Sequence, residues 1–160
     1  MNLFDASPAP RVLVTGAAGF IGFHLTQRLL DRGLQVDGVD SMTLYYEPSL
    51  KQARLDRLLA RPGFVFHRLD LADREGVTAL FERGRYDLVL HLAAQAGVRY
   101  SVEQPMAYLD SNLAGMLTVL EGCRHGGVKH LVYASSSSIY GAAREMPLRE
   151  DMVTDAPISL

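Results

Sequence analysis

Three glycines near the start of the chain, Gly16, Gly19 and Gly22, recur every third residue between an apolar run and a helical pattern. A dinucleotide pyrophosphate needs close backbone approach and free N–H groups at a helix N-terminus, whose dipole favours negative charge. Gly16 permits a tight turn, Gly19 keeps a side chain away from the phosphates, and Gly22 lets the helix pack on a sheet. The spacing predicts a phosphate-binding turn, and the alternative is a tight turn that binds nothing.

A carboxylate at the end of the second apolar run, Asp40, suits the adenosine end of the same ligand. It lies 18 residues after Gly22. A carboxylate at that point can accept both ribose hydroxyls and repels a 2'-phosphate, which predicts NAD rather than NADP. The alternative is a solvated aspartate at a strand end.

Four consecutive serines, 135–138, follow the last apolar run. Hydride transfer at a secondary alcohol requires a hydroxyl donor that orients the substrate and polarises the developing ketone. Serines at the carboxyl end of a strand, above a nicotinamide, suit that role, and a polar loop without function is the alternative. His91 lies inside an apolar strand, where we expect a core histidine rather than a base.

The elements that must position these residues alternate regularly along the chain. Apolar, β-branched runs predict strands, and apolar residues at helical spacing predict helices. We predict strands at 11–15, 35–39, 64–67, 87–91 and 129–134, and helices at 20–32, 49–60, 73–83 and 105–125. This order predicts an α/β fold, a Rossmann-type doubly wound parallel sheet truncated after the fifth strand, with ligands beyond the carboxyl ends of the strands.

Length and composition narrow the function classes. We expect a flexible N-terminus at 1–10 and one domain at 11–160. Apolar residues make up 48% and charged residues 21% of the chain, as is typical of a globular domain. The net charge of −2 does not indicate binding to nucleic acid or to an anionic membrane. The lone Cys123 excludes an internal disulfide, and we expect no metal site. No signal peptide or membrane span is visible, so we expect a soluble cytoplasmic domain.

The segment from Val14 to Gly22, Val-Thr-Gly-Ala-Ala-Gly-Phe-Ile-Gly, resembles the extended short-chain dehydrogenase/reductase family, which acts largely on nucleotide sugars. The resemblance implies that Asp70 contacts the adenine amine, that the backbone of Leu71 supports it, and that Asn112 faces the cofactor. Small side chains after the fourth strand leave room for ribose and nicotinamide, although close packing would need them equally. The expected cofactor-binding residues are Gly16, Ala18, Gly19, Phe20, Ile21, Gly22, Asp40, Asp70, Leu71, Leu92, Ala93, Ala94 and Asn112.

The same resemblance implies roles for the serines. Ser136, four residues before Tyr140, matches the Ser or Thr that polarises the substrate hydroxyl in the family. Ser137 and Ser138 stand where related nucleotide-sugar 4,6-dehydratases carry Asp and Glu, an acid–base pair that eliminates water. Serine cannot serve as that acid, so oxidation followed by return of the hydride is favoured. We therefore expect Ser136, Ser137 and Ser138 to be the catalytic residues.

Two further segments, 40–55 and 92–101, are similar to UDP-glucuronate 4-epimerases. The similarity implies a homodimeric enzyme that uses bound NAD to interconvert UDP-glucuronate and UDP-galacturonate through a 4-keto sugar. A UDP-glucose 4-epimerase, a nucleotide-sugar decarboxylase and a dinucleotide-binding module without chemistry remain alternatives.

The family's base is a Tyr followed four residues later by a Lys, and this pair does not occur in the 160 residues. Glu47 stands four residues before Lys51, and His125 four before Lys129. Residues 156–160 resemble those that lead into the family's Tyr, so the resemblance implies that the substrate region is not among these residues, and we expect an incomplete domain. We therefore expect these 160 residues alone to have negligible epimerase activity.

Overall fold

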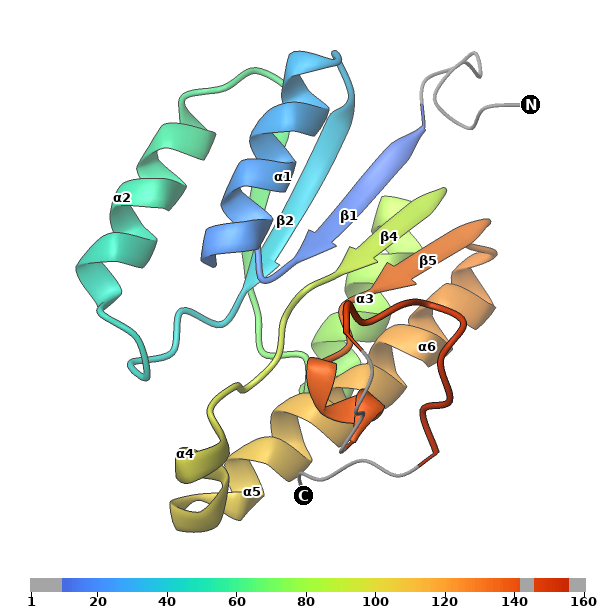
Figure 1. Ribbon diagram of the computed structural model, residues 1–160. Helices are drawn as coiled ribbons and strands as arrows, with labels where there is room; N and C mark the ends of the chain where they lie inside the picture. The colour runs from blue at the N-terminus through green and yellow to red at the C-terminus, as the bar shows by residue number, and fades with distance from the viewer. Residues whose placement is uncertain (1–9, 142–145, 156–160) are drawn as a thin grey trace.

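A single parallel sheet forms the centre of the computed structural model, which describes residues 10–141 and 146–155 (Figure 1). The strand order is β3-β2-β1-β4-β5, with every neighbouring pair parallel. The strands are β1 (Arg11–Thr15), β2 (Gln35–Asp40), β3 (Phe64–Arg68), β4 (Leu88–His91) and β5 (His130–Tyr133). The chain reverses the direction in which strands are added between β3 and β4, which places the switch point of the sheet between β1 and β4.

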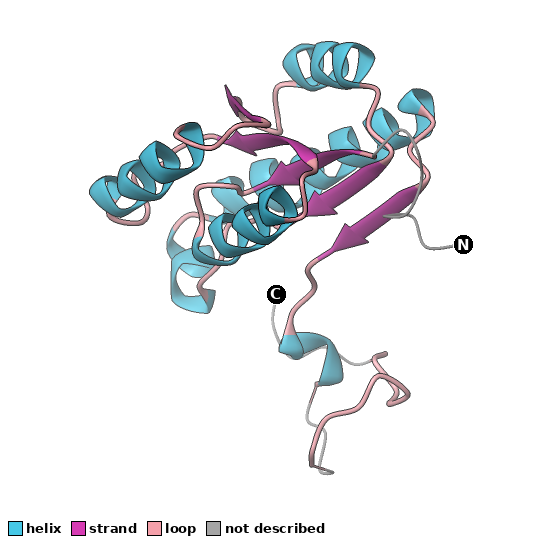
Figure 2. Cartoon of the chain, turned by 90° about the horizontal axis from the view of Figure 1, so that it is seen from above, coloured by secondary structure: helices cyan, strands magenta, loops and turns pink. Residues whose placement is uncertain are grey.

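Helices cover both faces of the sheet, as the view from above shows (Figure 2). The first face carries α1 (Phe20–Asp31) and α2 (Pro48–Leu59), and the second carries α3 (Arg74–Gly84) and α6 (Gly115–Gly126). Apart from α6, each of these strands and helices begins and ends within one or two residues of its predicted range. The α/β doubly wound fold class is confirmed.

Alternating side chains of β1 build two separate cores. Val12 and Val14 are buried with Phe23 on the α1 side, whereas Leu13 is buried with Phe81 on the α3 side. Successive side chains of a strand point to opposite faces, so a strand buried on both faces reads as a continuous apolar run. The apolar run in the sequence is explained by this double burial.

The single helix predicted at 105–125 is wrong in detail. The structure divides it into α5 (Pro105–Tyr108), a π-helical segment η2 (Leu109–Ala114) and α6, and a short helix that was not predicted, α4 (Val98–Glu103), precedes it. A π segment inserts an extra residue per turn and often lies at functional sites. Here it contains Asn112.

Beyond β5 the chain leaves the sheet. The described sheet ends on β5, where Val132 and Tyr133 are 46% and 57% exposed. A short 3-10 helix, η3 (Ser137–Tyr140), follows and lies apart from the layered body (Figure 2). Within the described ranges no helix is long and apolar enough to cross a membrane. Residues 1–9 of the expected N-terminal segment, and the segment 156–160, lie outside the described residues.

Candidate cofactor-binding site

A cavity of about 710 Å³ opens beyond the carboxyl ends of β1, β2 and β4. Its wall combines the glycine turn, the loop after β2, the start of α2 and the turns after β3 and β4. The predicted cofactor residues in the wall are Gly16, Gly19, Phe20, Ile21, Gly22, Asp40, Asp70, Leu71, Leu92, Ala93 and Ala94. Ala18 and Asn112 are not part of it.

Close backbone packing explains the glycines of the turn. Gly16 has a φ of +70°, and a Cβ there would lie 2.9 Å from the backbone nitrogen of Ala93. At Gly22 a Cβ would lie 2.1 Å from the carbonyl oxygen of Gly16. No other residue type fits without moving the backbone of the turn or of the segment after β4. The sequence interpretation of Gly16 as a tight turn and of Gly22 as a packing contact is supported by these contacts.

The turn directs the N-terminus of α1 into the cavity. Gly19 is the N-cap residue and supplies no side-chain hydrogen bond, and the first turn contains no acidic residue. The first N–H groups of a helix have no intrahelical partner. Since these groups carry partial positive charge, the surface around Phe20 and Ile21 suits an anion such as a pyrophosphate.

Asp40, buried at the end of β2, already accepts three hydrogen bonds. Its Oδ2 accepts from the backbone N–H of Ala18 at 3.2 Å, and its Oδ1 accepts from the backbone N–H of Met42 at 2.8 Å and from Lys51 Nζ at 2.9 Å. A carboxylate offers about four acceptor positions, so roughly one remains for a ribose hydroxyl. The sequence interpretation expected two. Ala18 therefore acts by holding Asp40 rather than by lining the cavity.

Sequence reasoning missed Lys51, the partner of Asp40. The Lys51 side chain is 10% exposed and that of Asp40 is 4% exposed, so the ion pair is buried in the cavity wall. Lys51 is one of two lysines among 16 Lys and Arg residues. A compact ammonium in an otherwise arginine-rich helix was the available signal, because Lys and Arg differ in geometry and hydration.

Thr15 and His91 fix the turn after β4, and Thr15 had no role in the sequence interpretation. The Thr15 hydroxyl accepts from the backbone N–H groups of Leu92 and Ala93, both at 3.1 Å. It lies 2.8 Å from His91 Nδ1, so its own proton is directed to that nitrogen. His91 is buried, and burial lowers its pKa. His91 is therefore a hydrogen-bonded core histidine, as expected.

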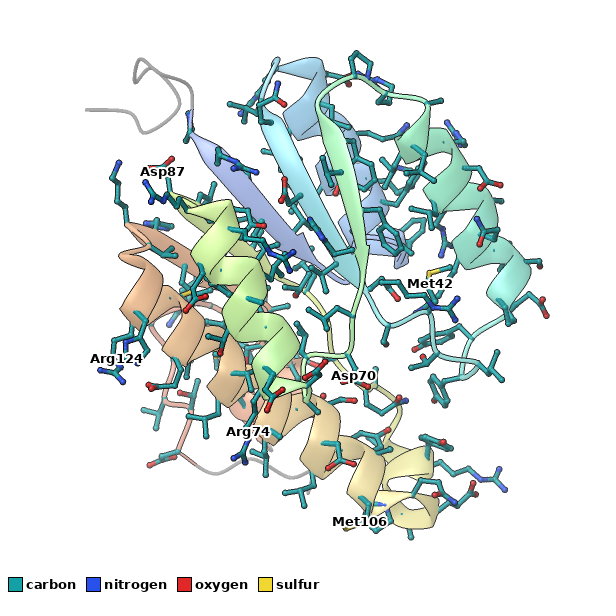
Figure 3. The ribbon with its side chains drawn as sticks, turned by 180° about the vertical axis from the view of Figure 1, so that it is seen from behind. Met42, Asp70, Arg74, Asp87, Met106 and Arg124 are labelled. Carbon is teal, nitrogen blue, oxygen red and sulfur yellow. The ribbon has the colours of Figure 1, made fainter. Side chains whose placement is uncertain are left out.

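The turn after β3 brings Asp70 to the same end of the sheet. Asp70 Oδ1 accepts from the backbone N–H of Ala72 at 2.9 Å, and Asp73 caps α3 through the N–H of Gly76. In the view from behind, Asp70 and Met42 lie at the carboxyl ends of the strands, whereas Asp87 lies at the opposite end (Figure 3). Asp70, for which the resemblance implied an adenine contact, thus lies at the carboxyl ends of the strands and lines the cavity.

Asn112 acts on the cavity through Gln95. Its Oδ1 accepts from the backbone N–H of Gln95 at 2.8 Å, and its Nδ2 donates to the Gln95 carbonyl at 2.9 Å. Gln95 itself lines the cavity. The paired hydrogen bonds make Asn112 a positioning residue of the loop after β4.

Four tyrosine rings form a cluster beside the cavity, and one of them, Tyr46, lines it. The rings of Tyr45 and Tyr100 lie 4.6 Å apart, as do those of Tyr45 and Tyr46, and Tyr100 lies 6.3 Å from Tyr108. The Tyr108 hydroxyl donates to the Ala96 carbonyl at 2.8 Å and also contacts the Gly97 carbonyl. This tyrosine cluster links the loop after β2 to the loop after β4, a role that the sequence did not indicate.

The serines predicted to be catalytic lie outside the cavity wall. Ser136 caps η3 by accepting from the N–H of Ser138 at 3.2 Å, and its hydroxyl donates to the Ser138 hydroxyl at 3.1 Å. Ser136 and Ser137 are exposed and Ser138 is half-buried. Within the described ranges, no group of three or more His, Cys, Asp or Glu side chains is arranged to hold a metal ion.

Comparison with known proteins gives a consistent result. Residues 12–159 match the NAD dependent epimerase/dehydratase family. A probable UDP-glucuronate 4-epimerase of Rhizobium meliloti (strain 1021) is 46% identical over 150 residues, which cover 94% of this chain and 44% of that protein. An uncharacterized 37.6 kDa protein of Escherichia coli O111:H- is 58% identical over 150 residues, covering 94% and 45%. The chain spans less than half the length of the curated relatives it matches.

Solved structures agree with the sequence relatives. The UDP-glucuronic acid 4-epimerase of Bacillus cereus, in complex with UDP-glucuronic acid and NAD, has a TM-score of 0.80 and 34% identity, covering 93% of this chain and 46% of that one. The UDP-glucose 4-epimerase of Thermus thermophilus, in complex with NAD, has a TM-score of 0.78 and 41% identity, covering 93% and 45%. The chain belongs to the NAD-dependent epimerase/dehydratase family.

Proposed function

We propose that these residues bind NAD for an enzyme that epimerises a UDP-sugar at C4. One observation carries the proposal: the glycine turn leaves no room for a Cβ at Gly16 or Gly22 and directs the N-terminus of α1 into the cavity. A bare backbone beside a helix N-terminus suits a pyrophosphate. When bound, NAD+ would accept a hydride from C4 of the sugar and return it to the opposite face.

The chain's own residues would orient the cofactor. The N–H groups at the start of α1 would hold the pyrophosphate, and Asp40 would accept from a ribose hydroxyl through its remaining acceptor position. Asp70 and Leu71 would border the adenine, and Ala93 and Ala94 would border the nicotinamide half. All of these residues line the cavity.

UDP-glucuronate is the substrate that we propose. Support comes from relatives at 46% and 47% identity, a probable UDP-glucuronate 4-epimerase of Rhizobium meliloti and a UDP-glucuronate 4-epimerase of Arabidopsis thaliana. Ser136 would donate to the C4 hydroxyl, and Ser137 and Ser138 would hydrogen-bond the sugar without adding charge. Because no Tyr-x-x-x-Lys occurs in the 160 residues, the proton acceptor is missing and these residues alone would not epimerise.

The proposal is tested with a chimaera that joins residues 1–155 to the remaining part of the Bacillus cereus enzyme, chosen to supply Tyr-x-x-x-Lys. We expect conversion of UDP-glucuronate to UDP-galacturonate, detected by chromatography, and none with residues 1–160 alone. A matched chimaera with Ser136→Ala should lose roughly a hundredfold or more in kcat, the typical size of one positioned donor. A chimaera that folds but turns over no UDP-sugar would contradict the proposed function, and turnover by residues 1–160 alone would contradict the inactivity.

We further propose that the complete protein is a homodimer that uses the outer face of η2 and α6. Four leucines at helical spacing on this face, Leu109, Leu113, Leu117 and Leu120, are 44%, 66%, 56% and 41% exposed. Contiguous exposed apolar side chains of this kind are typical of protein interfaces.

A further inference from the structure

A threonine of α6 contacts the turn that follows β3. The Thr118 hydroxyl lies within hydrogen-bond distance of two carbonyl oxygens, that of Gly115 on its own helix at 2.8 Å and, at shorter range, that of Leu71. A hydroxyl has one proton to donate, so we assign it to the closer acceptor, Leu71. Since Leu71 lines the cavity, this hydrogen bond connects α6 to the cavity wall.

The Leu71 carbonyl depends on this hydrogen bond. Among the described residues no backbone N–H and no second side chain donates to it. Leu71 is 7% exposed, so loss of the Thr118 hydroxyl would leave a buried carbonyl oxygen without a partner. On its other side the turn is held at Leu69, whose N–H donates to the Asp40 carbonyl at 3.3 Å. The turn at 69–72 is therefore fixed between β2 and α6.

A glycine permits this close approach of α6. Gly115 and Thr118 are three residues apart and therefore share a face of the helix. A Cβ at Gly115 would lie 3.2 Å from the Leu71 Cβ, which is tighter than an ordinary van der Waals contact. Two positions on one face of α6 thus contact the same residue of the turn.

The turn leaves one carboxylate oxygen of Asp70 available to a ligand. Asp70 lines the cavity, and its Oδ1 accepts from the backbone N–H of Ala72 at 2.9 Å. Within residues 10–141 and 146–155 its Oδ2 accepts no hydrogen bond. A carboxylate only accepts, so it suits an amine and disfavours a carbonyl oxygen at the same place. Adenine, which has an amine at C6, is therefore favoured over hypoxanthine, which has a carbonyl oxygen there.

We propose that Thr118 is a positioning residue of the cofactor site, which holds the turn at 69–72 so that Asp70 selects the amine of adenine. The inference rests on the proposed function, which places the adenine beside Asp70 and Leu71. Thr118 is half-buried and outside the cavity wall, so it acts through the Leu71 carbonyl and not by contact with the cofactor. The strength of base selection therefore depends on a hydroxyl in α6.

The test is Thr118→Val, a substitution that removes the donor and nearly keeps the shape. Calorimetric titrations with NAD+ and with nicotinamide hypoxanthine dinucleotide measure the preference for adenine in each chain. We expect the unaltered chain to prefer NAD+ roughly tenfold, the size of one hydrogen bond to a charged group. Thr118→Val should bind NAD+ roughly fivefold more weakly and the hypoxanthine analogue almost equally well, which reduces the preference to about twofold. Full retention of the preference in Thr118→Val contradicts the inference.

Two further variants separate the hydrogen bond from a general loosening of the fold. Thr118→Ser keeps the hydroxyl and should keep the preference for NAD+. Thr78→Val is the matched control, because the Thr78 hydroxyl donates at 2.8 Å to the Arg74 carbonyl of its own helix and lies outside the cavity wall. Its preference should equal that of the unaltered chain. Equal losses in Thr118→Val and Thr78→Val, or in Thr118→Val and Thr118→Ser, would show that the Thr118 hydroxyl does not position the turn.

The ratio of two affinities keeps the test decisive if Thr118→Val is less stable, because both ligands bind the same folded fraction and that fraction cancels. If Thr118→Val does not fold, Gly115→Ala takes its place. It favours the helix, keeps every hydrogen-bonding group and displaces Leu71, so it should also reduce the preference. If the unaltered chain does not bind NAD+, the proposed function fails. If it binds NAD+ without preference over the analogue, or the variants keep the preference, only the role of Thr118 is wrong.

Discussion

Gly22 packs against the turn before α1, so that a Cβ there would lie 2.1 Å from the Gly16 carbonyl oxygen. The methyl group of an alanine would meet backbone atoms, which cannot move aside as a side chain can. We therefore predict that Gly22→Ala destabilises the chain by roughly 1–3 kcal/mol and removes binding of NAD+. Urea unfolding and calorimetry measure the two effects. Gly126→Ala is the control: its nearest neighbour, Phe81 Cδ1, would be 3.5 Å away, and we expect less than about 1 kcal/mol. Unimpaired NAD+ binding by Gly22→Ala would contradict the assignment of the turn.

His91 makes the stability of the site dependent on pH. Burial lowers the pKa of His91 below the ordinary value of 6.5. Below about pH 6.5 this histidine is therefore protonated more readily in the unfolded chain than in the folded chain. Stability contributed by neutral His91 is present above about pH 6.5 and is lost as the pH falls further. We predict that lowering the pH from about 7.5 to about 5.5 reduces the free energy of unfolding more in the native chain than in the His91→Asn variant. The asparagine side chain of this variant does not titrate, and its oxygen can still accept the hydrogen bond from Thr15. Urea unfolding at the two pH values measures both free energies of unfolding. An equal loss in the native chain and in His91→Asn would contradict the prediction.

The tyrosine cluster connects separate elements: Tyr45 in the loop after β2 contacts Tyr100 in α4, and Tyr108 in α5 bonds to the loop after β4. Tyr108→Phe removes the hydroxyl that donates to the Ala96 carbonyl, while the ring contacts remain. We predict roughly fivefold faster amide hydrogen exchange at residues 95–100, which corresponds to about 1 kcal/mol for one hydrogen bond. Tyr133→Phe, on the exposed edge strand β5, is the control and should leave the exchange at residues 95–100 unchanged. If amide exchange at residues 95–100 is as slow in Tyr108→Phe as in the native chain, the Tyr108 hydroxyl does not stabilise this loop.

The sequence could predict the elements that obey a simple period. Strands buried on both faces, such as β1, read as apolar runs, and α1 shows its buried stripe and the closing Gly33, which has a φ of +76°. The division of 105–125 could not be predicted, because the π segment η2 has no pattern of its own.

The candidate site shows the same limit. The glycines and Asp40 were found because backbone geometry ties them to positions next to strands. Lys51 and Thr15 were missed because their roles depend on side chains that meet across the fold, 11 residues from Asp40 and 76 residues from His91 respectively. Such contacts carry no period, so a single sequence does not indicate them.

At the scale of the whole molecule, the exposed leucines of η2 and α6 predict self-association. We expect residues 1–160 to associate with increasing concentration in light scattering coupled to size exclusion, and the pair Leu113→Glu with Leu117→Glu to shift the chain toward monomer. Leu59→Glu, on α2 and 54% exposed, is the control and should associate like the native chain. If the native chain is monomeric at high concentration, the proposed dimer face is wrong.

The cofactor site is tested by a titration of the isotope-labelled 160-residue chain with NAD+, followed by amide chemical shifts in NMR. We predict saturable shifts confined to the cavity wall: the glycine turn at 16–22, the end of β2 at 40–43, Asp70 and Leu71, and the loop at 92–96. Amides around Asp87, at the opposite end of the sheet, should not move. Absence of shifts at millimolar NAD+, or shifts centred away from the glycine turn, would contradict an NAD site in this cavity.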